Sequence, residues 1–183
     1  MLPDLSHFFD PGQPAPEPSR ETAQQAQKEA ESGTPALQAH GFYVSIARRA
    51  LEPYRPAGAS RLTVLVVEDD PAFSVLLSNL MKLQGFQALT ARNRAEVVAG
   101  LAQVPAPDLV LLDVRLPDVN GFDILLRMKQ HPSLAGIPVI MLTGEATREA
   151  VTQGLASGAD GYVTKPFELE TLVSAIKLVL GLS

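Results

Sequence analysis

Five short runs rich in Val, Ile and Leu follow one another from Arg61 onward, and helical patterns separate them. The expected strands are Leu62–Val67, Phe86–Ala91, Leu109–Leu112, Ile137–Leu142 and Gly161–Thr164. Strands that alternate with helices form parallel sheets, because each crossover returns the chain to the same end of the sheet. The pattern therefore predicts an α/β domain over residues 61–183, with helices on both faces of a five-stranded parallel sheet.

The helical segments carry apolar side chains at the spacing of one helix face. The first shows Phe73, Leu76, Leu77, Leu80 and Met81, and the last shows Leu169, Leu172, Val173, Ile176 and Val179. Asp70 before Pro71 is typical of a helix start, with the acid as the N-cap and proline at the first helical position. Asn93, followed three residues later by Glu96, predicts another start of the capping-box type.

Residues 1–60 differ from the rest of the chain because they contain eight of its fifteen prolines. Proline removes backbone donors and favours extended chain, so we expect a largely irregular N-terminal extension. Apolar residues return over 37–51 and predict one short amphipathic helix that ends before Pro53. This segment is either a linker with transient helix, which we favour, or a helix for docking or dimerisation.

Composition excludes several classes of protein. The chain has no cysteine, so disulfides, thiol catalysis and cysteine-ligated metals are excluded. Asp and Glu outnumber Lys and Arg by 20 to 15, which argues against nucleic acid or an anionic membrane as a partner. Apolar runs are far shorter than a membrane span, and the N-terminus lacks the basic residues of a secretory signal. We expect a cytoplasmic protein.

Polar side chains follow four of the predicted strands. Glu68 and Asp69 follow the first, Asp113 the third, Thr143 the fourth and Lys165 the fifth. Ligands of open parallel sheets bind beyond the carboxyl ends of the strands, so we expect these side chains to share one edge. Asp70 is left out of this set, because its role as an N-cap explains it.

The charges of this cluster predict a divalent cation. Three carboxylates, from Glu68, Asp69 and Asp113, face one ammonium, from Lys165, which leaves a net charge of −2. Unscreened carboxylates raise one another's pKa, and a cation removes that penalty. Hard oxygen ligands favour Mg²⁺ or Mn²⁺ over zinc and copper. The arrangement indicates phosphoryl chemistry, with Asp113 as the nucleophile that accepts the phosphoryl group and Lys165 and Thr143 as partners of its oxygens.

Four motifs carry these residues. They are Val66-Val67-Glu68-Asp69-Asp70, Leu111-Leu112-Asp113-Val114-Arg115-Leu116-Pro117-Asp118-Val119-Asn120-Gly121, Met141-Leu142-Thr143-Gly144 and Tyr162-Val163-Thr164-Lys165-Pro166-Phe167. In this order and spacing, the chain from about Arg61 to Gly181 resembles the receiver domain of a bacterial two-component response regulator. The resemblance covers roughly two-thirds of the sequence. It implies a flavodoxin-like (βα)5 doubly wound sheet in the order 2-1-3-4-5.

The resemblance also implies roles for single residues. A sensor histidine kinase or a histidine phosphotransfer protein would phosphorylate Asp113, while Thr143 and Lys165 hold the phosphoryl oxygens. The metal ligands that it implies are Asp69, Asp113, Glu68 through water, and the backbone carbonyl of Arg115. It further implies a cis peptide at Lys165–Pro166.

A switch follows from the same resemblance. Thr143 would move toward the phosphoryl group and Tyr162 would rotate inward, so that the face around Gly161–Thr164 and the two neighbouring helices reads out phosphorylation. That face or the helix expected over 37–51 would be the site of homodimerisation. The side chains of Arg115 and Glu145 would tune hydrolysis and could pair across the mouth of the site. The downstream protein target is unknown.

The residues also bear on functions other than this switch. The residues favour a stand-alone regulator that signals through protein contacts, or a relay intermediate that passes the phosphoryl group onward. A phosphatase of the haloacid-dehalogenase type needs an acid two residues after the nucleophile, where this chain has Arg115. An FMN carrier needs a phosphate loop after the first strand, where Glu68 and Asp69 would repel the phosphate. A scaffold without chemistry is disfavoured because no site residue is missing, and His40 lacks the surroundings of a phosphorelay histidine.

Overall fold

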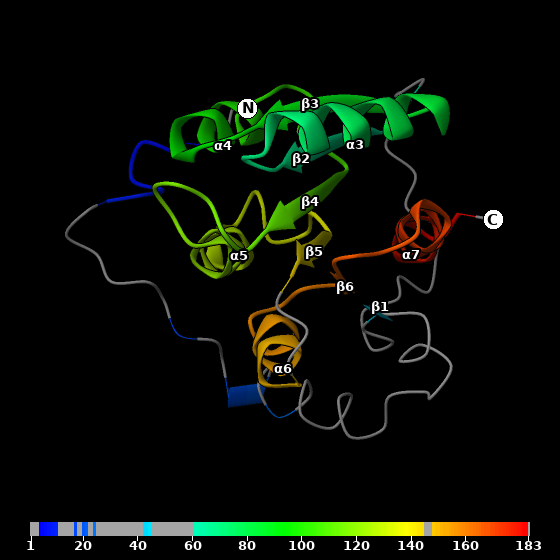
Figure 1. Cartoon of the computed structure of the whole chain (residues 1–183). Helices are drawn as coiled ribbons and strands as arrows, with labels where there is room; N and C mark the ends of the chain where they lie inside the picture. Colours follow the sequence, from blue (N-terminus) through cyan, green and yellow to red (C-terminus); the bar gives the residue numbers. More distant parts are fainter. Residues whose placement is uncertain are drawn as a thin grey trace.

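The computed structural model describes residues 4–10, 17, 20, 21, 24, 42–44, 61–144 and 148–182. Within these residues one six-stranded sheet has the order β1-β6-β5-β4-β2-β3 (Figure 1). The strands are β1 (Phe42–Val44), β2 (Thr63–Val67), β3 (Gln87–Ala91), β4 (Leu109–Asp113), β5 (Val139–Thr143) and β6 (Gly161–Thr164). The helices are α3 (Pro71–Leu83), α4 (Arg94–Leu101), α5 (Gly121–Gln130), α6 (Arg148–Ala156) and α7 (Leu169–Leu180).

The five strands expected from the sequence are confirmed, and they pair in parallel. Their order, β3-β2-β4-β5-β6, is the flavodoxin-like order 2-1-3-4-5. β2, β4 and β5 are buried along their whole length, as strands covered by helices on both faces must be. The alternation of apolar runs with helical patterns therefore predicted the topology correctly.

The helix expected over 37–51 is wrong at Phe42–Val44, which form the edge strand β1. β1 runs antiparallel to β6, with Tyr43 opposite Tyr162, and the rest of 37–51 lies outside the described residues. Without β1, one side of β6 would present unpaired backbone N–H and C=O groups, so pairing with a neighbouring strand overrides the weak helical pattern. The sheet thus includes a piece of the N-terminal extension.

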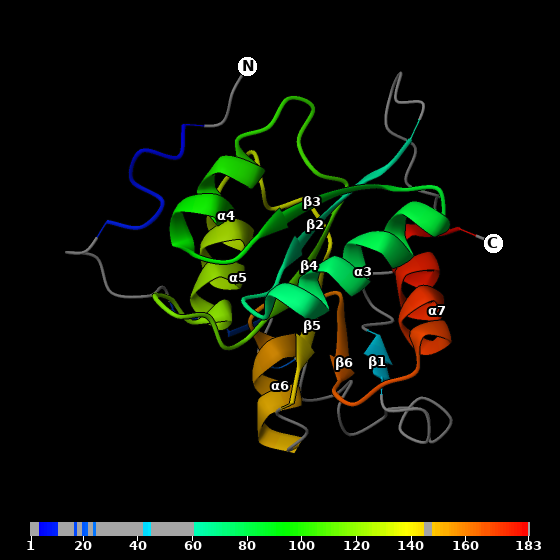
Figure 2. The same cartoon turned by 45° about the horizontal axis from the view of Figure 1, so that its top comes forward.

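Helices cover both faces of the sheet (Figure 2). One core cluster joins the strands to α4, α5 and α6 through residues such as Val97, Leu125 and Leu155. A second cluster joins the opposite face to α3 and α7 through residues such as Leu77 and Ile176. The carboxyl ends of the strands remain at one edge, between these two layers.

The expected helix starts are confirmed. The carboxylate of Asp70 accepts a hydrogen bond from the backbone N–H of Phe73 at 2.7 Å, and Asn93 caps α4 by accepting from Glu96 N–H at 3.0 Å. The apolar stripes are only partly buried, however. Leu76 of α3 and Leu169 of α7 are 45% and 39% exposed, because both line a groove beside the strand ends.

Residues 4–10 pack against the domain instead of extending from it. Leu5 and Phe8 are buried and belong to the core cluster on the α4–α5 side of the sheet. Nothing in the Pro-rich composition of residues 1–60 predicted this contact. Among the described residues, no helix is both long and apolar enough to cross a membrane.

Gly121 opens α5 and lies directly against the backbone of Asp113. A Cβ at this position would overlap with the carbonyl oxygen of Asp113 and lie 2.8 Å from the Cα of Val114. The N–H of Gly121 donates to the carbonyl of Val114 at 2.8 Å, which fixes this close approach. The helix start is therefore held against the strand end that carries the central carboxylate.

Gly121→Ala is expected to lower the free energy of unfolding by about 1–3 kcal/mol, because the backbone of α5 or β4 must shift. Gly136→Ala is the matched control, since a Cβ there meets nothing within 4 Å and the glycine has no positive φ. That control should change the stability by less than about 1 kcal/mol. Urea unfolding followed by circular dichroism measures both, and equal losses would contradict the close approach at Gly121.

Candidate functional site

The structure brings the polar side chains at the strand ends together at one edge of the sheet. Glu68 follows β2, Asp113 ends β4, Thr143 ends β5 and Lys165 follows β6. Carboxylate oxygens of Glu68, Asp69 and Asp113 all lie within 4.8 Å of one another. Glu68 and Asp113 are buried, whereas Asp69 is exposed at the mouth of the cluster. The spatial convergence expected from the sequence is present.

Lys165 lies at the centre of this cluster. Its Nζ is 2.6 Å from Glu68 Oε2 and 2.9 Å from Asp113 Oδ2. Its backbone N–H donates to the carbonyl of Thr143 at 2.7 Å, so β5 fixes the point from which the side chain starts. The ammonium also lies 4.6 Å from the centroid of the Phe73 ring, whose face stabilises a cation. The Lys165–Pro166 peptide is cis, as the resemblance implies.

The ionisation of the buried groups reflects this crowding. Burial raises the pKa of Glu68, and the neighbouring Asp113 carboxylate raises it further, while the hydrogen bond from Lys165 acts in the opposite direction. Burial alone would lower the pKa of Lys165, but its hydrogen bonds to Glu68 and Asp113 prevail and raise it. The pKa of Lys165 is thus held above its usual value, and the pKa of the Glu68 carboxyl lies above its usual range because burial outweighs the contact with Lys165.

Backbone N–H groups hold the other carboxylate oxygens. Arg115 N–H donates to Asp113 Oδ1 at 3.3 Å, and Asp70 N–H donates to Glu68 Oε1 at 3.2 Å. Asp70 itself uses its carboxylate to cap α3, which agrees with its exclusion from the metal set. The central carboxylates are thus oriented by the chain on both sides of the cluster.

The remaining expected site residues differ in their placement. Thr143 is buried at 1% exposure beside the cluster, whereas the side chain of Arg115 is exposed. Tyr162 is fully buried, and its ring packs so closely on Gly154 of α6 that a Cβ there would lie 2.8 Å from two ring atoms. Glu145, expected to pair with Arg115, lies outside the described residues.

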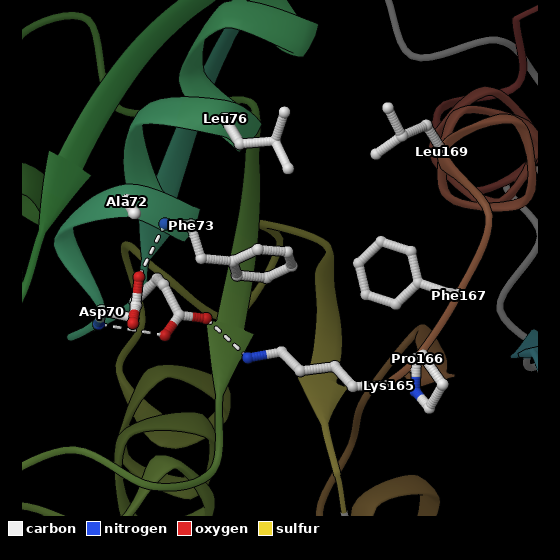
Figure 3. A pocket seen from close by; sticks show the side chains of 9 residues that line it. Asp70, Ala72, Phe73, Leu76, Lys165, Pro166, Phe167 and Leu169 are labelled. Carbon is white, nitrogen blue, oxygen red and sulfur yellow. Dashed lines mark hydrogen bonds and ion pairs between the residues drawn. The ribbon is translucent and has the colours of Figure 1, made fainter.

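A groove of about 920 Å³ opens beside the cluster, between α3 and the start of α7. Glu68 and Lys165 contribute its polar wall, and Figure 3 shows Phe73 and Phe167 facing each other across it. The two rings lie 6.0 Å apart between centroids. The sequence places Phe73, Leu76 and Leu169 on the apolar faces of their helices, and their partial exposure follows from how α3 and α7 are placed.

The donor set fits a divalent cation. Three carboxylates within 4.8 Å of one another offer hard oxygen ligands, and their combined charge exceeds what one lysine neutralises. The exposed Asp69 leaves the site open to solvent on one side, which suits an ion that keeps several of its waters. Thiolate and imidazole ligands, which zinc prefers, do not take part in this cluster.

Comparison with known proteins identifies the fold and the family. The family model for the response regulator receiver domain matches residues 64–177. The chemotaxis protein CheY4 of Vibrio cholerae is 30% identical, with a TM-score of 0.61, and the match covers 66% of this chain and 100% of that one. The probable transcriptional regulatory protein TcrX of Mycobacterium tuberculosis is 36% identical over 126 residues, 69% of this chain and 53% of TcrX.

A third relative corrects one expectation. RpaA of Synechocystis, named a DNA-binding dual master transcriptional regulator, is 37% identical over 117 residues, 64% of this chain and 48% of RpaA. Such relatives contradict the expectation, drawn from net charge, that nucleic acid is not a partner. The chain spans about half the length of these curated relatives, so the charge of the matched region says nothing about the partners of a whole regulator.

The matched residues include every strand end of the acidic cluster, from Glu68 after β2 to Lys165 after β6. The buried carboxylates, and the lysine that contacts them, therefore lie within the residues that the family model matches. The chain belongs to the receiver-domain family of two-component response regulators.

Proposed function

We propose that this chain accepts a phosphoryl group on Asp113 in a Mg²⁺-dependent reaction and acts as a switch controlled by phosphorylation. The observation that carries the proposal is the position of Lys165, whose ammonium contacts both Glu68 and Asp113. An ammonium beside a buried carboxylate can neutralise the oxygens of an arriving phosphoryl group. Thr143, buried at the end of the neighbouring strand, would donate a hydrogen bond to another of these oxygens.

The donor is a histidine kinase or a histidine phosphotransfer protein. An oxygen of Asp113 forms a bond to phosphorus while the P–N bond to the donor's imidazole breaks, and the imidazole takes up a proton. The groove between α3 and α7 lies beside Glu68 and Lys165 and would offer apolar side chains to the surface of the donor. Leu76 and Leu169 are the large exposed hydrophobic residues among those that line this groove.

Mg²⁺ would be held by Asp69, Asp113, the backbone carbonyl of Arg115, and Glu68 through a water molecule. The ion supplies positive charge to the phosphoryl oxygens and to the carboxylates as they come together. Glu68 and Asp113 keep their orientation through the N–H groups of Asp70 and Arg115, so the ligands are arranged before the ion binds. Mn²⁺ would use the same oxygen ligands.

Phosphorylation would be read out on the face formed by α6, β6 and α7. A phosphoryl group gains hydrogen bonds from Thr143 and Lys165 in one state only, which biases a two-state equilibrium. Tyr162 lies fully buried on β6, three residues before Lys165, and would couple the site to this face. A protein target or a second copy of the chain would bind there, where β1 already pairs with β6.

An intact-mass measurement tests the phosphoacceptor. Incubation with Mg²⁺ and acetyl phosphate should add one phosphoryl group to the full chain, and the adduct should be lost at alkaline pH because it is an acyl phosphate. Asp113→Asn should abolish the adduct, while Asp123→Asn on α5 serves as the matched control and should keep it. Steady hydrolysis of many phosphate esters without an adduct would instead support the haloacid-dehalogenase type of phosphatase.

Glu68→Gln is expected to raise the melting temperature of the metal-free protein by a few degrees, because the carboxylate is buried and its pKa is raised. The penalty of the charged form grows as the pH rises through the folded-state pKa, so this gain should vanish in acid. The same variant should show a smaller rise in melting temperature with Mg²⁺ than the unmodified chain, since it loses a ligand charge.

The exposed Glu149→Gln on α6 is the control for both effects and should leave them unchanged. Differential scanning fluorimetry with and without Mg²⁺ at neutral and acidic pH provides the measurement. A metal-free Glu68→Gln protein that melts at a lower temperature at neutral pH would contradict the assigned charge balance.

A further inference from the structure

The N-terminal residues 4–10 lie against the outer side of α4 and α5 (Figure 2). Leu5 and Phe8 are only 8% and 6% exposed, and they belong to the same core cluster as Val97 of α4 and Met128 of α5. His7, which lies between them, is exposed. A short segment thus presents apolar side chains to the domain and polar ones to solvent, as a docked peptide does.

The end of α5 holds the backbone of this segment. Arg127 Nη1 donates to the carbonyl of Phe8 at 3.0 Å, and the ring Nε2 of His131 lies 3.2 Å from the carbonyl of Asp4. The N–H of Ser133 donates to the other ring nitrogen of His131, so Nε2 is the atom that carries the proton and donates to Asp4. Two hydrogen bonds, near the start and the end of the segment, fix its position on the helix.

Phe9 connects the segment to the loop that leads from Asp113 to α5. The centroid of its ring lies 5.0 Å from the guanidinium carbon of Arg94 and 5.7 Å from that of Arg127, and the face of an aromatic ring attracts cations. Arg94 Nη2 donates to the carbonyl of Asp118 at 3.0 Å, and Arg94 N–H donates to the Asp118 carboxylate at 2.9 Å. Asp118 lies in the loop that leads from Asp113 to α5.

We infer that the surface between α4 and α5 is a binding site for residues 4–10 of the same chain. Docking of this segment orders Arg94, and Arg94 holds the loop that carries the Arg115 carbonyl. The expected effect on Mg²⁺ binding rests on the proposed function. Binding of Mg²⁺ at Asp113 and docking of the segment stabilise the same loop. Because coupling between two binding events is reciprocal, each event strengthens the other.

A Phe8→Ala/Phe9→Ala variant of the full chain tests the inference, with His7→Ala as the matched control in the same segment. In ¹⁵N-labelled protein, the amide resonances of Arg94, Arg127 and Asp118 should shift in the double variant and stay in place in the control. The dissociation constant of Mg²⁺, obtained by titration of the same spectra with MgCl₂, should rise about threefold or more in the double variant only. Phe9→Leu keeps the apolar volume but lacks the ring face, so it should weaken Mg²⁺ binding without exposing Phe8.

A double-mutant cycle locates the connection. Phe9→Leu should have little further effect on Mg²⁺ binding once Arg94→Ala has removed the guanidinium, because the two residues act through one contact. Additive effects of the two changes would overturn the route through Arg94. Unchanged resonances at α4 and α5 in Phe8→Ala/Phe9→Ala would overturn the docking itself.

The outcomes separate this inference from the phosphoacceptor proposal. If the double variant binds Mg²⁺ and is phosphorylated as well as the unmodified chain, the proposed function stands and the coupling is overturned. If the unmodified chain does not bind Mg²⁺, the proposed function is overturned. The resonance shifts still report whether the segment docks. Docking that appears only at high protein concentration, together with a dimer in sizing experiments, would overturn docking within one chain.

Discussion

One ammonium group holds together carboxylates from two different strands. Lys165 reaches Glu68 after β2 and Asp113 on β4, although β5 separates its own strand from β4. Neighbouring strands lie about 4.8 Å apart, so only a long side chain that starts at the strand end can cross this distance. The positions of the ammonium and the two carboxylates depend on the rest of the sheet. They follow from the order of the strands, from the burial of β2, β4 and β5, and from the fixed backbone of Lys165. The three carboxylates carry more negative charge than this ammonium neutralises, which suits the site to a divalent cation.

The sequence was sufficient for the parts of the fold that depend on local pattern. Apolar runs predicted the parallel strands, and Asp70 and Asn93 predicted the starts of their helices because capping depends on neighbouring residues alone. The site was predictable for a related reason: the carboxyl ends of parallel strands meet at one edge whatever their order in the sheet.

Long-range contacts were not predictable in this way. The pattern around Phe42–Val44 favours a helix, but these residues form a strand because they pair with the edge of the sheet at β6. Phe8 belongs to a Pro-rich extension, and its burial depends on a surface more than a hundred residues away. A signal was present, since Leu5, Phe8 and Phe9 have the spacing of one face in a segment that is otherwise polar. The exposure of Leu76 and Leu169 likewise depends on how α3 and α7 lie side by side.

Two parts of the N-terminal extension, residues 4–10 and β1, contact the domain at separate places. Residues 4–10 lie on α4 and α5, and β1 lies on the opposite side of the molecule at β6, close to α7 (Figures 1 and 2). The first contact lies next to the loop after Asp113, and the second lies on the strand that leads into Lys165. Both contacts therefore adjoin chain segments that carry the acidic cluster, which gives the extension a physical connection to the state of that cluster.

Chemical mapping of the phosphorylated residue tests the proposed phosphoacceptor most directly. Reduction with sodium borohydride converts an aspartyl phosphate into homoserine, which peptide mass spectrometry locates in the chain. After treatment with acetyl phosphate and Mg²⁺, we expect homoserine at position 113 alone, and none when EDTA is present throughout. Homoserine at another aspartate, or equal conversion at position 113 without divalent metal, would show that this acidic cluster is not a metal-dependent phosphoacceptor.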